Sequence, residues 1–222
     1  MEEEFKEYVG GNLKDFTVLD AFDSLFLNGK ANQEAQNPSK YLLYQDPMAG
    51  TFDREVVESG VDTGAYYKKL KKMMEICQEN SPEYAALFAY YEKLAAVLAD
   101  KADLGVRMKA AYDKKQLLAL KEICEKEIPE TIQNLEEMKV LREDLWMSEA
   151  KPFGYELMDV KLGAVITRLN STIRRTKKYL DGGIPCLEEL EETRLSYFEK
   201  NADKRENRWS QIISGSDLID TI

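Results

Sequence analysis

The sequence predicts an all-α protein, an antiparallel bundle of about four long helices with an irregular N-terminal arm. Beyond Asp62, apolar residues recur at steps of three and four, which places them on one face of a helix. We therefore expect an arm at residues 1–60 and a helical bundle at 61–192. A polar, weakly periodic tail at 193–222 is expected to pack on the bundle.

The N-terminal arm mixes short helical patterns with turn residues. Residues 2–27 indicate short helices around a Gly-Gly break, and residues 28–39 are polar and typical of a loop. Pro38 and Pro47 then enclose a short extended or one-turn element. Asp46, directly before Pro47, is typical of a turn cap, with a ligand-binding carboxylate as the alternative.

Two long helices are predicted in the first half of the bundle. Asp62 is a suitable N-cap for a helix that runs to about Gln78. Ser81-Pro82-Glu83 then combines a cap residue, a first-turn proline and a first-turn acid, which is a strong start signal. The helix that begins there is expected to continue to about Tyr112.

Two further long helices follow at about 116–147 and 155–180. Pro129 lies inside the first of these patterns and is expected to kink that helix, because proline removes a backbone hydrogen bond. Gly182 is expected to end the last helix at its C′ position. Together these segments predict a helical hairpin with its turn near residue 150.

The turn of this hairpin carries an unusual number of aromatic and charged side chains. They are Trp146, Lys151, Phe153, Tyr155 and Glu156. Aromatic residues here can simply cover the end of the helical core, or the corner can serve as a binding or docking site. Both interpretations remain open from the sequence. In the tail, Trp209 begins a segment to Ile213 that suggests a short strand or turn docked on the bundle.

Composition limits the possible partners. The chain has 222 residues, 44% of them hydrophobic, and a net charge of -10, so neither nucleic acid nor an anionic membrane is an expected partner. No stretch reaches the ~20 apolar residues of a spanning helix. The acidic start, Met1-Glu2-Glu3-Glu4, is unlike a signal peptide. The three cysteines form no CxxC pair, which indicates a reducing compartment and predicts a cytoplasmic location.

The sequence shows no catalytic motif. It has no histidine, so it contains no Ser-His-Asp site, and the commonest zinc ligand is missing. No dinucleotide, P-loop or nucleophile-elbow pattern occurs, and the paired acidic residues lie on helical segments where a solvated face explains them. We therefore expect no cofactor and no metal. These patterns favour a helical scaffold or interaction domain, such as a free-standing module with a groove for a partner helix.

Several segments, taken in order, resemble one enzyme family. They are Asn-Pro-Ser-Lys-Tyr-Leu-Leu-Tyr-Gln-Asp-Pro (37–47), Lys-Ala-Asp-Leu-Gly-Val-Arg (101–107), Lys-Pro-Phe-Gly-Tyr-Glu (151–156), Asp-Val-Lys-Leu-Gly (159–163) and Glu-Asn-Arg-Trp (206–209). The chain is similar, from about residue 5 to about 213, to the C-terminal part of bacterial beta-N-acetylhexosaminidases of glycoside hydrolase family 20.

This resemblance implies a TIM barrel upstream in the same polypeptide, which removes terminal N-acetylglucosamine or N-acetylgalactosamine through the substrate's own acetamido group. The family's Asp-Glu pair orients that group and donates the proton, but no Asp is followed by Glu in this chain. The resemblance therefore implies a non-catalytic domain that supports the barrel and contributes to a homodimer. Alternatively, the hairpin corner reaches an active site. Expected contacts with substrate or a neighbouring domain are Tyr44, Asp46, Trp146, Lys151, Phe153, Glu156 and Trp209.

Overall fold

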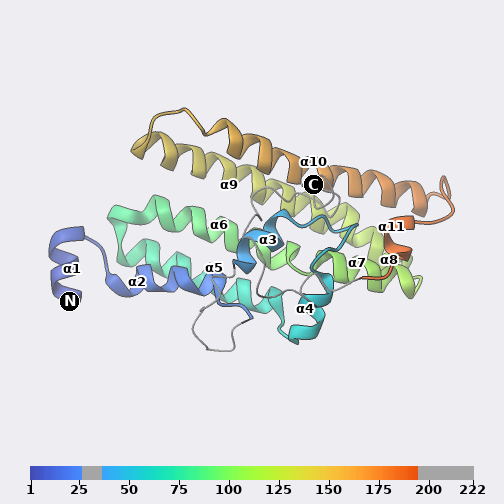
Figure 1. Ribbon diagram of the computed structural model, residues 1–222, viewed down its shortest axis with the longest axis horizontal. Coiled ribbons are helices and arrows are strands. Elements are labelled where there is room, and N and C mark those ends of the chain that lie inside the picture. Colours follow the sequence, from blue (N-terminus) through green and yellow to red (C-terminus); the bar gives the residue numbers. More distant parts are fainter. Residues whose placement is uncertain (27–36, 195–222) are drawn as a thin grey trace, which may run out of the picture.

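The computed structural model describes residues 1–26 and 37–194, and this part of the chain is helical with no strand. The predicted fold class, all-α, is confirmed. Figure 1 shows two pairs of long helices stacked side by side, with shorter helices gathered around and between them. Of the C-terminal tail predicted at 193–222, the structure describes only Thr193 and Arg194, and the predicted strand or turn at 209–213 lies outside the described residues.

The helix bounds are as follows. The α-helices are α1 (Glu2–Val9), α2 (Leu13–Thr17), α3 (Pro38–Tyr44), α4 (Asp53–Ser59), α5 (Thr63–Asn80), α6 (Ala85–Lys101), α7 (Leu104–Asp113), α8 (Leu117–Glu122), α9 (Ile128–Glu149), α10 (Glu156–Leu180) and α11 (Glu188–Glu191). Within the same residues, η1 (Val18–Asp23) and η2 (Pro82–Tyr84) are 3₁₀ turns, and η3 (Ile123–Glu127) is a π turn.

The long helices form two hairpins, α5–α6 and α9–α10, which meet where α6 packs against α9. Their shared core contains Phe88, Leu98, Leu135 and Leu169, all with no exposed surface. Each fully buried side chain of this size contributes roughly 1.5–3 kcal/mol through removal of apolar surface from water. The two hairpins, rather than four unbroken helices of one bundle, organise the fold.

The long helix predicted to end near Tyr112 is broken after Lys101. The chain turns there, and α7 begins at Leu104 in a new direction. The sequence gives no proline at this position. The break instead brings the Lys101 side chain to the end of α3, where it makes contacts described below. The apolar pattern of 82–112 is therefore shared between two helices.

Pro129 was predicted to kink one long helix, but the structure instead begins a new helix, α9, directly before it. Pro129 lies in the first turn of α9, and the π turn η3 directly precedes it. A proline ring clashes with the carbonyl four residues earlier in a regular helix, and a wider turn relieves that clash. The apolar face is preserved across the turn, with Cys124 and Ile128 both buried.

The N-terminal segment folds onto the two hairpins. Its predicted short helices form as α1, α2 and η1, and residues 38–44 form the helix α3 instead of an extended or one-turn element. Phe22 packs against the rings of Tyr67 and Tyr91, and the rings of Tyr41 and Phe52 lie 4.6 Å apart. Phe22, Tyr41, Phe52 and Tyr67 are buried within the chain itself, and Tyr91 is partly buried against them.

No helix among the described residues combines the length and the apolar character that crossing a lipid bilayer requires.

Candidate functional site

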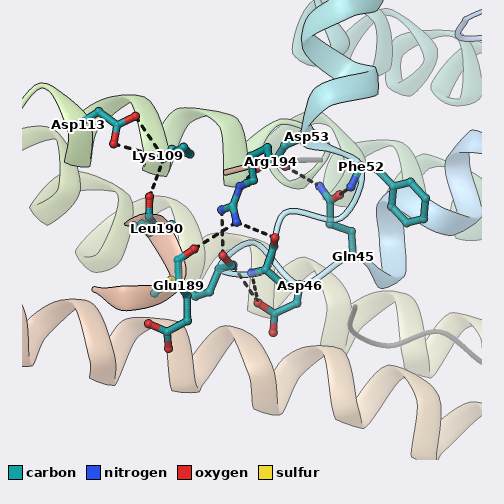
Figure 2. Close-up of polar contacts among 11 residues, drawn as sticks. Gln45, Asp46, Phe52, Asp53, Lys109, Asp113, Glu189, Leu190 and Arg194 are labelled. Carbon is teal, nitrogen blue, oxygen red and sulfur yellow. Dashed lines mark hydrogen bonds and ion pairs between the residues drawn. The ribbon is translucent and has the colours of Figure 1, made fainter. Parts of the chain in front are cut away.

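The loop between α3 and α4 carries buried polar side chains that hold its shape. Gln45 accepts a hydrogen bond from the Phe52 backbone N–H at Oε1 (2.7 Å) and donates from Nε2 to Asp53 Oδ1 (3.2 Å). Figure 2 shows this side chain lying across the loop. The contacts close residues 45–53 into a compact turn, and satisfied polar groups of this kind are expected wherever a loop is buried.

Asp46 both caps this turn and ties it to α10. Its Oδ1 accepts the backbone N–H groups of Met48 (2.8 Å) and Ala49 (3.1 Å), the arrangement that its place before Pro47 predicts. Its Oδ2 accepts from Arg168 Nε of α10 at 2.5 Å. Both carboxylate oxygens are therefore engaged within the chain, which is a structural role.

Lys101 lies beneath the same loop, with only 2% of its surface exposed. Its Nζ donates to the backbone carbonyl oxygens of Leu42 (3.1 Å) and Gln45 (2.5 Å) at the C-terminal end of α3. A cation is favourable there because the last carbonyls of a helix are unpaired and carry partial negative charge. Burial lowers the pKa of Lys101 to about 8, although the carboxylates of Asp46 and Asp53 oppose that shift.

Asp53 at the start of α4 is buried beside Arg194. Its Oδ2 lies 3.2 Å from Arg194 Nε, an ion pair in which the N–H does not point along a hydrogen-bonding direction. Burial raises the pKa of Asp53 to about 6, with Arg194 and then Lys101 acting in the opposite direction. We call Asp46, Asp53, Lys101 and Arg194, together with the half-exposed Arg168, the buried charge cluster.

Arg194 also joins the loop to the short helix α11. Its guanidinium donates to the carbonyl oxygens of Ala49 (2.6 Å), Met48 (2.8 Å) and Glu189 (3.2 Å), as Figure 2 shows. Nearby, Lys109 of α7 donates to the Leu190 carbonyl at 2.6 Å. Two cations thus anchor α11 through carbonyl groups.

Gly105 allows α7 to approach the buried charge cluster closely. A Cβ atom at this position would lie 2.5 Å from Asp53 Oδ1 and 2.7 Å from Oδ2, closer than carbon and oxygen atoms pack. The absence of a side chain therefore has a direct steric reason. At Gly163, inside α10, an added Cβ would meet nothing within 4 Å, so no steric contact requires glycine at that position.

The hairpin corner at 146–156 is shaped by its own side chains. The Trp146 indole N–H donates to the Lys151 carbonyl (2.8 Å), and Glu156 Oε2 accepts from the Gly154 N–H (2.8 Å). Gly154 has a φ of +95°, a conformation that favours glycine. Phe153 is 82% exposed, and Lys151 is exposed beside it. The corner presents these two side chains outward.

The buried part of the corner is connected to α6 through Arg142. The Arg142 guanidinium lies 5.6 Å from the centre of the Trp146 ring and 5.8 Å from that of Tyr90, within the range of cation–π contacts. Tyr155 is buried, and its hydroxyl donates to the Lys139 carbonyl at 3.0 Å. Trp146 and Tyr155 therefore cover the end of the hairpin core.

A cavity of about 320 Å³ opens between η1, α3, α6 and α10, and we call it the tyrosine cavity. Three tyrosine rings and three charged side chains are among its lining residues. They are Asp23, Lys40, Tyr44, Tyr90, Tyr91 and Lys161. Tyr90 joins it to the corner through Arg142. Burial raises the pKa of Tyr90 to about 12 and also raises the pKa values of Tyr44 and Tyr91.

The residues predicted as contacts thus lie in separate places. Tyr44 lines the tyrosine cavity, and Asp46 belongs to the buried charge cluster. Trp146, Lys151, Phe153 and Glu156 form the corner, whereas Trp209 lies outside the described residues.

Sequence reasoning missed Asp23, Tyr91 and Lys161 of the cavity and Lys101 of the cluster. A usable signal existed for Lys101, which follows the apolar run Leu94–Ala99 without an acidic residue four positions away. Among the residues the structure describes, no three His, Cys, Asp or Glu side chains gather in a way that could hold a metal ion.

We predict that Asp53→Asn flattens the pH dependence of stability between about pH 4 and 6. The pKa of Asp53 rises from 3.8 to about 6 on folding, so the folded protein binds more protons than the unfolded chain in this window. Stability from this group is present below pH 4 and lost as the pH rises to 6, by roughly 3 kcal/mol at most. The measurement is urea unfolding of wild type and variant at a series of pH values.

The matched control for this prediction is Asp113→Asn, which removes a half-exposed carboxylate of α7 and leaves Asp53 in place. This control should keep the wild-type slope. Parallel stability curves for Asp53→Asn and wild type would contradict the prediction.

Comparison with known proteins gives one family. A model described as the Glycoside Hydrolase 20C C-terminal domain matches residues 14–209, which is most of the chain. No curated protein sequence matches it. The match covers the α3–α4 loop, the tyrosine cavity and the hairpin corner. The chain belongs to the glycoside hydrolase 20C C-terminal domain family.

Proposed function

We propose that this chain is the non-catalytic helical domain that follows the barrel of a beta-N-acetylhexosaminidase and supports that barrel. The observation that carries this proposal is the family match over residues 14–209. The barrel would hydrolyse terminal N-acetylglucosamine or N-acetylgalactosamine, so amino-sugar glycans reach this domain only through its parent enzyme. A bacterial, cytoplasmic enzyme of carbohydrate metabolism is the setting proposed, and the free thiols of Cys77, Cys124 and Cys186 support a reducing compartment.

The buried carboxylates are hydrogen-bonded or paired with arginines of the same chain, and this supports a non-catalytic role. A catalytic carboxyl group must reach the bond it protonates or the group it orients. Asp46 instead pairs with Arg168 and caps a turn, and Asp53 is enclosed by Arg194, Gln45 and α7. The adjacent Asp-Glu pair that the family resemblance implies does not occur in the sequence.

Exposed apolar side chains near the hairpin corner support a docking role. We call Met147, Phe153, Leu157 and Val160 the hairpin-end surface, and each exposes at least 44% of its area. Leu157 and Val160 are three residues apart and therefore share one face of α10. Large apolar groups left exposed together are typical of surfaces that contact another protein. We propose that the hairpin-end surface forms the contact between two copies of the parent enzyme.

The purified 222-residue chain should not release the aryl group of an aryl N-acetyl-β-glucosaminide above the uncatalysed rate. The reason is the missing Asp-Glu pair, because transition-state charge and the leaving-group proton then have no positioned partner. A colorimetric assay across pH 4–8 measures this directly. The positive control is the longer polypeptide that includes the upstream barrel. Turnover by the chain alone would overturn the non-catalytic assignment.

In that longer polypeptide, the double substitution Leu157→Glu and Val160→Glu should convert dimers into monomers. Two carboxylates on an apolar contact lose their hydration without a partner, which costs several kcal/mol per ion. Size-exclusion chromatography with light scattering gives the mass.

The control for this assembly test is Leu118→Glu, because Leu118 is 84% exposed on α8, away from the hairpin corner. It should leave the dimer unchanged. A double variant that remains dimeric would show that the hairpin-end surface is not the contact.

A further inference from the structure

We propose that the tyrosine cavity binds a polyhydroxylated ligand of monosaccharide size that carries one negative charge. This binding site is additional to the supporting role proposed above and does not depend on it. The cavity volume of about 320 Å³ lies at the small end of the roughly 300–1,000 Å³ typical of small-molecule sites. One sugar ring with its substituents is the size of ligand that such a volume admits.

The first observation is that three phenol hydroxyls of the cavity have no hydrogen-bond partner among the described residues. They belong to Tyr44, Tyr90 and Tyr91; the rings of Tyr90 and Tyr91 touch each other, and Arg142 lies over the Tyr90 ring. A mostly buried tyrosine usually finds a partner for its hydroxyl. None of these three hydroxyls is sealed from solvent, so each is available to a ligand that has several hydrogen-bonding groups of its own.

Other tyrosines of the chain show the usual pattern. Tyr66 donates to the Ala21 carbonyl at 2.5 Å, Tyr84 to the Val9 carbonyl at 2.7 Å, and Tyr155 to the Lys139 carbonyl at 3.0 Å. Each of these bonds joins two elements distant in the sequence. The tyrosines of the cavity, like Tyr179, have no such bond within the described part of the chain.

The second observation is a fixed carboxylate at the cavity. Asp23 Oδ1 accepts hydrogen bonds from the Ser39 hydroxyl (2.6 Å) and, more weakly, from the Ser39 backbone N–H (3.3 Å). Both bonds go to one oxygen, and neither accounts for the Oδ2 atom. A carboxylate held in this way can accept two vicinal hydroxyl groups of a sugar, because each oxygen has more than one acceptor direction.

The third observation is the balance of charge. Burial raises the pKa of Asp23, and the hydrogen bonds from Ser39 and then the charge of Lys40 act in the opposite direction. Lys161, from α10, also lines the cavity and has no ion-pair partner in the described part of the chain. The lining of the cavity thus includes two ammonium groups and one carboxylate, an excess of one positive charge, although the whole chain has a net charge of -10. A ligand with a single anionic group balances this excess.

The tyrosine rings of the cavity also offer aromatic faces on which a sugar ring can pack. The C–H groups on one side of a sugar ring are slightly positive and pack on the negative face of an aromatic ring. A purely apolar ligand would leave the phenol hydroxyls and the ammonium groups unsatisfied, which is costly in a concave site. Sugar phosphates and sugar acids share the required features, namely a ring, several hydroxyls and one anionic substituent.

The test is isothermal titration of the purified 222-residue chain with glucose 6-phosphate, using glucose as its neutral counterpart. Glucose 6-phosphate should bind at least about tenfold more tightly than glucose, because hydrogen bonds to charged groups contribute more than neutral ones. Tyr44→Phe and Tyr91→Phe should each weaken binding roughly 3- to 10-fold. Lys161→Met should reduce the preference for the phosphorylated sugar.

Two controls separate binding from folding. Tyr44→Phe and Tyr91→Phe remove hydroxyls that have no partner among the described residues, so these variants should unfold in urea like wild type, whereas Tyr155→Phe should be less stable because its hydroxyl bonds the Lys139 carbonyl. Lys178→Met changes an exposed lysine on the same helix and should leave affinity unchanged.

Three results would overturn the assignment: no binding of glucose 6-phosphate at millimolar concentration, equal affinity for glucose and glucose 6-phosphate, or wild-type affinity in both phenylalanine variants. None of these results bears on turnover by the chain or on assembly of the parent enzyme, so the two proposals fail separately.

Discussion

The ammonium group of Lys101 is the contact on which the arrangement of the N-terminal half depends. Lys101 is the last residue of α6, and its ammonium group donates hydrogen bonds to two carbonyl oxygens at the end of α3. Asp46 and Asp53 flank it, and they are held in turn by Arg168 of α10 and Arg194 beyond α11. One small cluster of charges therefore joins α3, α4, α6, α10 and α11. A buried ion is costly, so such a cluster persists only when each member has partners.

The charged groups of this cluster are already paired within the chain and are therefore not available to bind a ligand. Its carboxylates are committed to arginines, to the Gln45 amide and to backbone N–H groups, and Gly105 lets α7 lie directly against Asp53. The tyrosine cavity has the opposite character, because its hydroxyls and Lys161 are uncommitted among the described residues. Structural and potential ligand-binding polar groups are thus distinguished by their hydrogen bonds rather than by residue type.

The sequence predicted those features that depend on local periodicity and capping. The bounds of α5 and α10 follow from the Asp62 cap, the apolar spacing and the glycine at residue 182, and Asp62 does accept the Ala65 N–H at 2.8 Å. The break after Lys101 could not be predicted in this way, because local spacing carries no sign of the contact that Lys101 makes there with residues 42 and 45, more than fifty positions away.

The candidate site was predictable to a similar degree. Asp46 stood out because Pro47 follows it and marks a turn, Tyr44 was named within the segment that resembles the family, and the aromatic corner stood out by composition. The Asp23–Ser39 bond, and the presence of Tyr91 and Lys161 in the wall of one cavity, depend on how η1, α3, α6 and α10 pack together. Periodicity places Tyr91 on an apolar stripe and therefore predicts only a core residue.

The central claim is that the Lys101 ammonium, rather than the apolar stem that carries it, holds the N-terminal segment to the helices. Urea unfolding of Lys101→Met at pH 7 tests this claim, because methionine keeps a stem of similar length and removes the charge. Loss of at least about 2 kcal/mol is predicted, since two buried carbonyls lose their donor and two carboxylates lose a neighbouring cation. Lys72→Met, at an exposed position of α5, should stay within about 0.5 kcal/mol of wild type. Equal stability of Lys101→Met and wild type would contradict the account.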